Sequence, residues 1–334
     1  MRDEKGTSAH DRRNNCSAKR EQGLVPDIKC QDILRMLPEL EGCFEIESRD
    51  ILNLDSSNIQ PEEWQYIAEI LAEMLPLYDG IIITHGTDTL AYTASALSYM
   101  LQNLHKPVVL TGAQIPIEQM FTDAKRNLQA AFAAVNAGIE GVVLAFDDKI
   151  ISGCRAVKVR TLGFNAFESI SAPYLGEIYA DGMHVYRKDM HPGKEQKPFC
   201  LKKELCTDVF LLKLIPGTNL EIFDRLLDMK YRGIVIEAFG AGGTHFERRN
   251  LIPKLQKLVE NGISIVACSQ CLYEKSDFSM YEVGQKLLEC GIIPGRDMTT
   301  EAIVTKLMWA LGQTKNPQKI REIFDTNYVG EVTL

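Results

Sequence analysis

Short apolar runs alternate along this chain with segments of helical spacing, and this alternation limits the folds that it can adopt. The apolar runs read GIIIT, KPVVLTG, GVVLAF, RGIVIEAFG and GISIVACS. Helical spacing follows four of them, at residues 90–102, 122–136, 247–261 and 281–290. The pattern is typical of α/β folds with parallel strands. Because the runs are apolar at consecutive positions, we expect the sheets to be covered on both faces.

The length of 334 residues, 45% of them hydrophobic, is sufficient for two domains with separate cores. The segment RKDMHPGKEQKPF, residues 187–199, is charged, contains two prolines and a glycine, and has neither a helical nor a strand period. We therefore predict a larger N-terminal parallel-sheet domain at 1–186, a linker at 187–206 and a smaller C-terminal α/β domain at 207–334.

Charge and composition exclude several classes of function. The net charge is −8 and the basic residues are scattered among acidic ones, so we expect a small-molecule ligand and no nucleic acid. No apolar segment reaches the ~18 residues of a membrane span, and no signal-peptide pattern begins the chain. The nine cysteines and six histidines have neither disulfide-scaffold nor metal-ligand spacing. These observations predict a cytoplasmic protein with no metal and no membrane association.

The segment GIIITHGTDTLAYTASAL, residues 80–97, places a polar turn between an expected buried strand and an expected helix. Thr87 and Asp88 supply a hydroxyl and a carboxylate there, beside the N–H groups and positive dipole end of the helix. A threonine hydroxyl becomes nucleophilic when a base removes its proton, so this turn is a candidate catalytic site. The alternative is structural, with Asp88 or Thr89 capping the helix.

Two further polar clusters have both a functional and a structural interpretation. NLDSSN, residues 53–58, precedes a helix predicted over 61–75 that begins at a proline, and its side chains could bind a carboxylate or cap the helix. GCRAVKVRT, residues 153–161, contains Lys158 among apolar and basic residues. A desolvated lysine beside other cations has a lowered pKa and can accept a proton, whereas most lysines are solvated at the surface.

Five segments together carry a resemblance to a known family: THGTDTLAYTASAL, LTGAQIPI, DSSN, TDAKRNLQAA and DMTTEAIVTKLMWALG. From about Gln22 to its C-terminus the chain resembles the bacterial cytoplasmic (type I) L-asparaginases of the asparaginase/glutaminase family. The resemblance implies hydrolysis of L-asparagine to L-aspartate and ammonia through an acyl-threonine intermediate. It also implies that no cofactor is needed and that the chain forms a homodimer or a homotetramer.

The resemblance implies a role for each of seven residues. Thr87, Asp88 and Lys158 would form a catalytic relay, in which Asp88 also holds the α-amino group of the substrate. The α-carboxylate would be held by Asp55, Ser56 and Ser57. Tyr281, in MYEVG, is a possible further contributor, since sites of this family receive groups from the C-terminal domain of a partner subunit.

The nucleophile of the family lies in a T-G-G-T-I motif after the first strand, and this motif is absent here. The first 22 residues instead contain ten charged side chains and few apolar ones. One set of codons for GTSAHDRRNNCS, read from its second nucleotide, gives Val-Leu-Val-Leu-Met-Thr-Gly-Gly-Thr-Ile-Ala. We therefore hypothesise that residues 1 to about 18 are a shifted-frame translation of an asparaginase start, in which Asn14 occupies the position of the nucleophile.

Two other functions fit parts of this sequence. If the N-terminal segment is natural, the chain could be a pseudoenzyme that binds a ligand without hydrolysing it. The second is the asparaginase-like subunit of the archaeal glutamyl-tRNA amidotransferase. That subunit carries an additional N-terminal barrel, for which we expect this chain to have no room.

Overall fold

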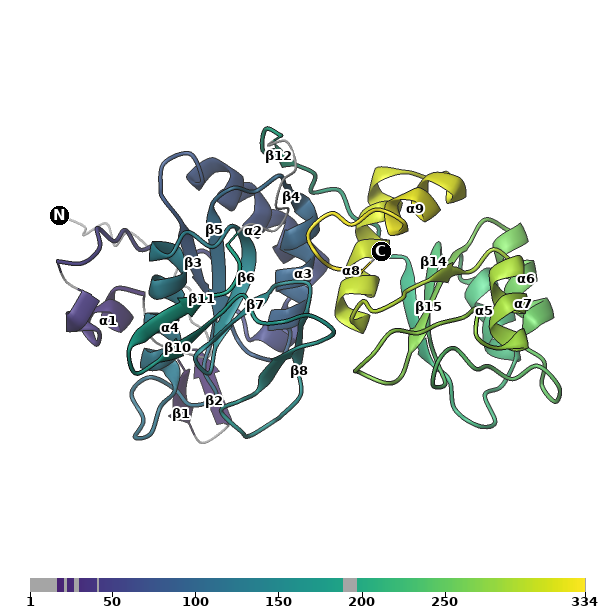
Figure 1. Cartoon of the computed structure of the whole chain (residues 1–334), viewed down its shortest axis with the longest axis horizontal. Coiled ribbons are helices and arrows are strands. Elements are labelled where there is room, and N and C mark those ends of the chain that lie inside the picture. The colour runs from purple at the N-terminus through teal and green to yellow at the C-terminus, as the bar shows by residue number, and fades with distance from the viewer. Residues whose placement is uncertain (1–16, 21–22, 27–29, 41, 189–196, 334) are drawn as a thin grey trace, which may run out of the picture.

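The computed structural model describes residues 17–20, 23–26, 30–40, 42–188 and 197–333. These residues form two α/β domains, a larger N-terminal one and a smaller C-terminal one (Figure 1). The two-domain α/β prediction is therefore confirmed. None of the described helices has the length and apolar character that a membrane crossing requires.

The N-terminal sheet has six strands in the order β11-β10-β7-β6-β5-β3. Their bounds are β3 (Ile81–Thr84), β5 (Pro107–Thr111), β6 (Gly141–Phe146), β7 (Lys149–Ser152), β10 (Gly176–Tyr179) and β11 (Gly182–Val185). The first three strands pair in parallel, as predicted, and the other three pair antiparallel. The sheet is therefore mixed, with the predicted parallel pairing confined to β3, β5 and β6. Asp147 and Asp148, with φ of 49° and 62°, form a two-residue turn that reverses the chain directly between β6 and β7.

Helices cover both faces of this sheet, which confirms the expectation from its continuous apolar strands. The helices are α2 (Pro61–Met74), α3 (Leu90–Met100) and α4 (Ala124–Asn136). α2 and α3 share one hydrophobic core with the sheet, whereas α4 contributes to a second core around Val109 and Val143. Every residue of β5 and β6 is buried. Among the described residues β3 forms the edge of the sheet, and within it only Ile83 is buried.

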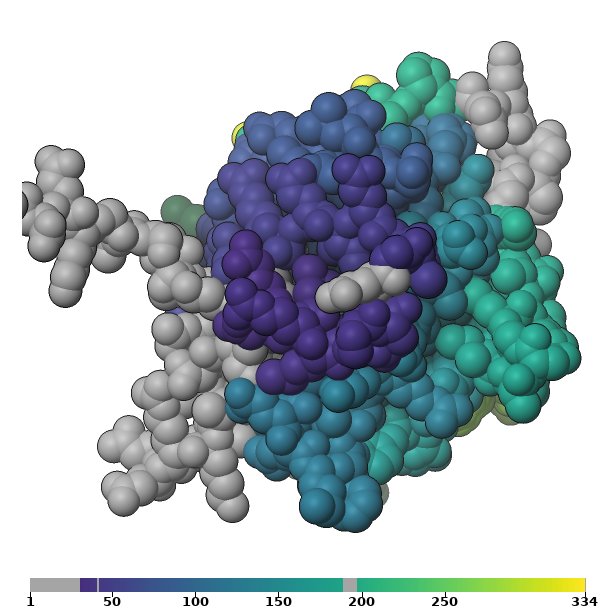
Figure 2. Space-filling model, turned by 90° about the vertical axis from the view of Figure 1, so that its left-hand side faces the viewer, coloured from purple at the N-terminus to yellow at the C-terminus, as the bar shows by residue number. Residues whose placement is uncertain are grey.

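The earliest described residues lie at one end of the N-terminal domain. A helix, α1 (Cys30–Arg35), packs Ile33 and, beyond the helix, Leu37 against Ala124 and Leu128 of α4. Figure 2 shows these first described residues, in purple, gathered on the face at that end. The shorter elements of this domain are β1 (Ser17–Arg20), β2 (Gly23–Pro26), η2 (Pro38–Leu40), η3 (Ser56–Asn58), β4 (Leu101–Gln102), β8 (Ala156–Lys158) and β9 (Phe167–Ser169).

The C-terminal sheet is wholly parallel, in the order β13-β14-β15-β16. Its strands are β13 (Val209–Lys213), β14 (Gly233–Ala238), β15 (Ser264–Ser269) and β16 (Ile293–Pro294), and its helices are α5 (Glu221–Asp228), α6 (Ile252–Glu260) and α7 (Glu282–Glu289). The helices predicted over 247–261 and 281–290 correspond to α6 and α7, with later starts. Between the domains, β12 (Cys200–Leu201) pairs with β4 of the N-terminal domain.

Helix α8 (Thr300–Gln313) lies between the two domains, and α9 (Pro317–Phe324) follows it (Figure 1). Trp309 of α8 stacks on Tyr99 of α3 at a centroid distance of 6.0 Å. Lys306 pairs with Glu331 at 2.5 Å, and both side chains are fully buried. The loss of one partner from a buried ion pair strongly destabilises a protein. The pairing of Lys306 with Glu331 therefore holds the C-terminal segment on α8.

Glu301, in the first turn of α8, has a raised pKa. Burial, together with repulsion from Glu237, raises it from the ordinary 4.5 to about 7. The dipole at a helix start favours a carboxylate by up to ~2 kcal/mol, and desolvation outweighs it here. Between pH 4.5 and about 7, Glu301 is therefore protonated in the folded protein and ionised in the unfolded chain.

We predict that the stability cost of Glu301 grows between pH 4.5 and about 7, because only the folded state has the raised pKa. Glu301→Gln removes the ionisable group, so its stability should exceed that of the parent by up to ~3 kcal/mol at pH 8, and this gain should vanish below pH 4.5. Urea unfolding of both proteins at pH 4.5 and pH 8 measures the difference. An equal difference at the two pH values would contradict the prediction.

Candidate functional site

The candidate site forms where β3 and β5 end side by side. Just after β3, the His85 N–H donates to the carbonyl of Thr111, the last residue of β5, at 2.8 Å. Gly112 follows directly, and a Cβ there would lie 2.4 Å from the His85 carbonyl oxygen, so glycine is required for this close approach. The two loops then meet, since the Thr87 hydroxyl donates to Gln114 Oε1 at 3.4 Å. Thr87 is held in a 4% exposed position at this junction.

Lys158 enters the site from β8, which forms a short antiparallel pair with β9. Its Nζ donates to Thr87 Oγ1 at 2.8 Å and to Asp88 Oδ1 at 2.7 Å. The Lys158 side chain is 19% exposed, whereas that of Asp88 is 60% exposed. The alternative of a solvated surface lysine is therefore wrong. The three side chains predicted for the catalytic relay make direct contact.

The loop that contains Ser56 docks onto the same turn. The Asp88 N–H donates to Ser56 Oγ at 3.3 Å, and the Thr89 hydroxyl donates to the Ser56 carbonyl at 2.6 Å. Neither Asp88 nor Thr89 caps α3 with its side chain, so the capping alternative is wrong for this turn. Asp55 does not cap the helix predicted over 61–75, whose N-cap is Gln60. Its carboxylate instead accepts from the N–H of Ser57 at 2.8 Å and caps η3.

The arrangement suits proton transfer next to a small polar ligand. A lysine amine that touches both a buried hydroxyl and a carboxylate can carry a proton to or from that hydroxyl. Asp88 is exposed enough to meet a cationic group, while the Ser56 hydroxyl lies beside it. In the described part of the chain, no group of three or more His, Cys, Asp or Glu side chains is arranged to hold a metal ion.

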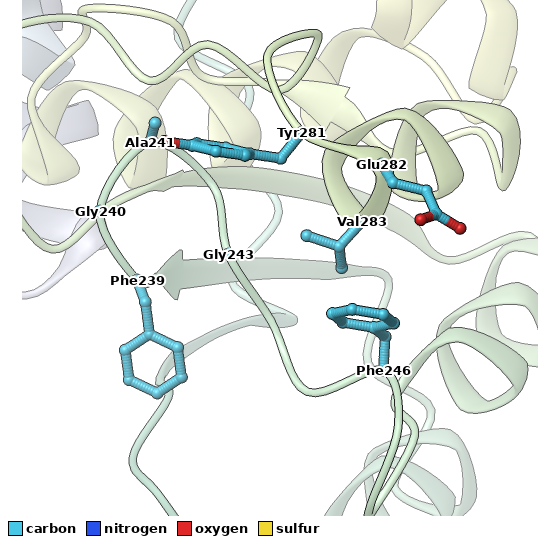
Figure 3. Close-up of a pocket in the computed structure, with 8 residues that line it drawn as sticks. All are labelled: Phe239, Gly240, Ala241, Gly243, Phe246, Tyr281, Glu282 and Val283. Atoms are coloured by element: carbon cyan, nitrogen blue, oxygen red, sulfur yellow. The ribbon is translucent and has the colours of Figure 1, made fainter.

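One predicted residue is not brought to this cluster within the chain, and another cannot be placed. Tyr281 is 58% exposed and precedes α7, where it lines a hollow of about 470 Å³ in the C-terminal domain. Figure 3 shows its ring extending toward Ala241, with Phe246 and Val283 on the other side of the hollow. A contribution of Tyr281 to the site of a second copy stays a prediction. Asn14 lies outside the described residues.

Gln114 belongs to the site and was not singled out from the sequence. Besides Thr87, it contacts the chain after Lys158, because its Nε2 donates to the carbonyls of Thr161 at 3.2 Å and Gly163 at 3.1 Å. Its own N–H donates to the Asp123 carboxylate at 3.0 Å. The position of TGAQIP after an apolar run was the available indication, since ligands bind at the carboxyl ends of parallel strands.

Comparison with known proteins matches a family model to each half of the chain. Residues 15–191 match the family model "Asparaginase, N-terminal", and residues 208–324 match "Glutaminase/Asparaginase C-terminal domain". The chain belongs to the asparaginase/glutaminase family. Its match to the family begins just after Asn14.

The relatives of this family member include archaeal and bacterial proteins. The L-asparaginase of Thermococcus kodakarensis is 43% identical over 318 residues, which are 95% of each chain. The solved structure of the thermostable L-asparaginase from that organism superposes with a TM-score of 0.90 at 42% identity, covering 97% of this chain and 98% of that one. L-asparaginase 1 of Escherichia coli K12 is 34% identical over 320 residues, 94% of this chain and 93% of that protein. Because the archaeal enzyme has the higher identity, the expectation of a bacterial type is not supported.

A component of the amidotransferase is also related to this chain. A glutamyl-tRNA(Gln) amidotransferase component from Pyrococcus furiosus is 36% identical over 322 residues, which are 94% of this chain and 73% of that protein. The match to the T. kodakarensis L-asparaginase has higher identity and extends over nearly all of both proteins.

We predict that Thr87→Val and Lys158→Met each lower asparagine hydrolysis by several orders of magnitude in a chain with a restored N-terminus, with little loss of stability. Lys149→Met is the matched control, because Lys149 also pairs with an aspartate, Asp147, and its side chain is 23% exposed. Ammonia release and thermal melting measure the two effects. Turnover near that of the parent in either site variant would remove Thr87 or Lys158 from the chemistry.

We predict that Ser56→Ala raises KM more than it lowers kcat. A hydroxyl that contacts the substrate carboxylate equally before and during reaction contributes uniform binding. Steady-state kinetics with L-asparagine separates the two constants. A fall in kcat at constant KM would instead place Ser56 in the reaction itself.

Proposed function

We propose that this protein is an amidohydrolase that converts L-asparagine and water to L-aspartate and ammonia. The observation that carries the proposal is the position of Lys158 Nζ, 2.8 Å from Thr87 Oγ1 and 2.7 Å from Asp88 Oδ1. A binding protein needs no amine that links a buried hydroxyl to a carboxylate, whereas hydrolysis needs such a proton carrier.

The reaction would proceed in two steps through an acyl-threonine. A threonine hydroxyl at position 14, in the restored chain, adds to the side-chain amide carbon, and backbone N–H groups stabilise the oxyanion. The C–N bond breaks, and the nitrogen leaves as ammonia with the proton of the hydroxyl. Lys158, acting with Thr87, then removes a proton from water. The resulting hydroxide attacks the ester, and the threonine oxygen regains its proton as aspartate leaves.

Substrate orientation would come from Asp88 and the loop that contains Ser56. The exposed Asp88 carboxylate would pair with the α-ammonium group. A substrate carboxylate requires hydrogen-bond donors, and the Ser56 hydroxyl and the backbone N–H groups of this loop are such donors. Asp55 would act by ordering the loop, because its Oδ1 already accepts from Ser57 N at 2.8 Å and from Ser57 Oγ at 2.6 Å.

The outer side of β3, which pairs with no other described strand, supports the hypothesis of a shifted reading frame. Ile81 and Ile82 are only partly buried, although β3 is apolar along its length. Apolar edge strands without a partner are avoided because they promote aggregation. The alternative frame supplies Val-Leu-Val-Leu-Met, a run suited to a buried strand beside β3, followed by a Thr-Gly-Gly-Thr loop at the carboxyl end of the sheet.

We further propose the type I, cytoplasmic branch of the family, a homodimer or homotetramer, and domain boundaries at 1–186, 187–206 and 207–334. Free thiols at the described cysteines, among them the exposed Cys43 and Cys271, suit a reducing compartment. The T. kodakarensis L-asparaginase has the higher identity to this chain, which favours an asparaginase over an amidotransferase component.

We predict that the unaltered chain hydrolyses L-asparagine negligibly and melts with low cooperativity. Replacing residues 6–16 with Val-Leu-Val-Leu-Met-Thr-Gly-Gly-Thr-Ile-Ala should restore both properties. Asparagine at position 14 has no hydroxyl to acylate, and the insert supplies a strand for the side of β3 that no described strand covers. Ammonia release and calorimetry measure the two effects.

A second replacement separates the two causes. The same insert with valine in place of the threonine at position 14 should recover the cooperative transition and not the activity. If the unaltered chain and the repaired chain turn over asparagine equally, the shifted frame and the nucleophile at position 14 are both wrong.

A further inference from the structure

A chain of three buried side chains runs from α2 to the peptide that precedes Thr87. The indole N–H of Trp64 on α2 donates to Thr93 Oγ1 at 3.0 Å. Thr93 on α3 contacts His85 Nε2 at 2.9 Å. His85 Nδ1 then lies 2.6 Å from the carbonyl oxygen of Gly86. Trp64 is 6% exposed, and Thr93 and His85 are fully buried.

The direction of these hydrogen bonds follows from what each atom can donate. A carbonyl oxygen only accepts, so His85 Nδ1 carries a proton toward Gly86. In the neutral ring, Nε2 is then an acceptor and takes the hydroxyl proton of Thr93. The Thr93 oxygen in turn accepts from Trp64, whose indole nitrogen only donates. Each group thus fixes the orientation of the next, and one tautomer of His85 satisfies all three contacts.

We propose that Trp64, Thr93 and His85 are positioning residues that fix the Gly86–Thr87 peptide, so that the Thr87 hydroxyl stays within reach of Lys158. This inference rests on the proposed hydrolysis and adds three residues to Thr87, Asp88 and Lys158. The Gly86 carbonyl belongs to the peptide unit that leads into Thr87, so a rotation of this unit displaces the catalytic hydroxyl. Displacements of about 1 Å can lower a rate by about 100-fold.

The three residues also join the two halves of the site. Trp64 lies one turn into the helix that follows the Ser56 loop, and Thr93 lies one turn into the helix that follows the catalytic turn. The hydrogen bond between them therefore holds the first turns of α2 and α3 together. The loop before α2 and the turn before α3 are joined as well, because Ser56 contacts Asp88 at 3.3 Å and Thr89 at 2.6 Å.

The test compares Thr93→Val with Thr93→Ser and with Thr305→Val. Thr305 is the matched control, because it is a fully buried helix threonine whose hydroxyl donates to the Glu301 carbonyl at 2.8 Å, away from the site. The full chain and the chain with a restored N-terminus are both assayed for kcat, KM and thermal melting. Histidine-selective ¹⁵N spectra report the tautomer of His85, assigned from its loss in His85→Gln.

We expect a 10- to 100-fold lower kcat in Thr93→Val with little change in KM, near-normal kcat in Thr93→Ser, and no kinetic effect in Thr305→Val. Trp64→Phe retains the aromatic packing and should lower kcat less. The parent spectrum should contain a proton on Nδ1 of His85. A proton on Nε2 alone, or equal kinetic effects of Thr93→Val and Thr305→Val, would overturn the proposal. If the restored parent releases no ammonia, the proposed hydrolysis fails, while the tautomer still decides whether His85 holds the Gly86 carbonyl.

Discussion

The contact of Lys158 with Thr87 and Asp88 is the interaction on which the organisation of the candidate site depends. The three residues come from two places in the sequence, the turn after β3 and the end of β8. Placing a lysine at 19% exposure costs desolvation energy, which the bond to the more exposed Asp88 carboxylate offsets. The antiparallel β7 leads the chain away from the carboxyl ends of β3 and β5. The later strand β8 places Lys158 against Thr87.

Sequence patterns predicted the local part of this architecture and missed the part that depends on distant packing. Continuous apolar runs identified β5, β6, β14 and β15, because a strand that is buried on both faces has apolar residues at consecutive positions. They did not distinguish the antiparallel β7, whose direction depends on the φ values of Asp147 and Asp148. Helix α8 also escaped prediction, since its buried residues face two domains at once and its apolar face is correspondingly broad.

The sequence likewise predicted some residues of the candidate site and missed others. Thr87, Asp88 and Lys158 were identified from unusual residue types beside apolar runs and from the family resemblance, and their contact was a matter of geometry. His85 lies in the same turn, but the sequence does not indicate that its ring contacts Thr93, the hydrogen-bond partner of Trp64. Gln114 escaped for the same reason. The partner of a buried hydrogen-bonding side chain is determined by the folded chain. Residues such as His85 and Gln114, which we assign to the site from their hydrogen bonds, are therefore recognised only in the structure.

The N-terminal segment links chemistry and folding in one stretch of chain. In the shifted frame, the residues that would complete the sheet beside β3 lead directly into the loop with the nucleophile. A single change of reading frame would therefore remove a strand and a hydroxyl together. A pseudoenzyme that had lost only catalysis would be expected to retain the strand, since an apolar edge is a liability whether or not the protein is an enzyme. The partly exposed isoleucines of β3 thus favour an altered start over a domain that evolved without its first strand.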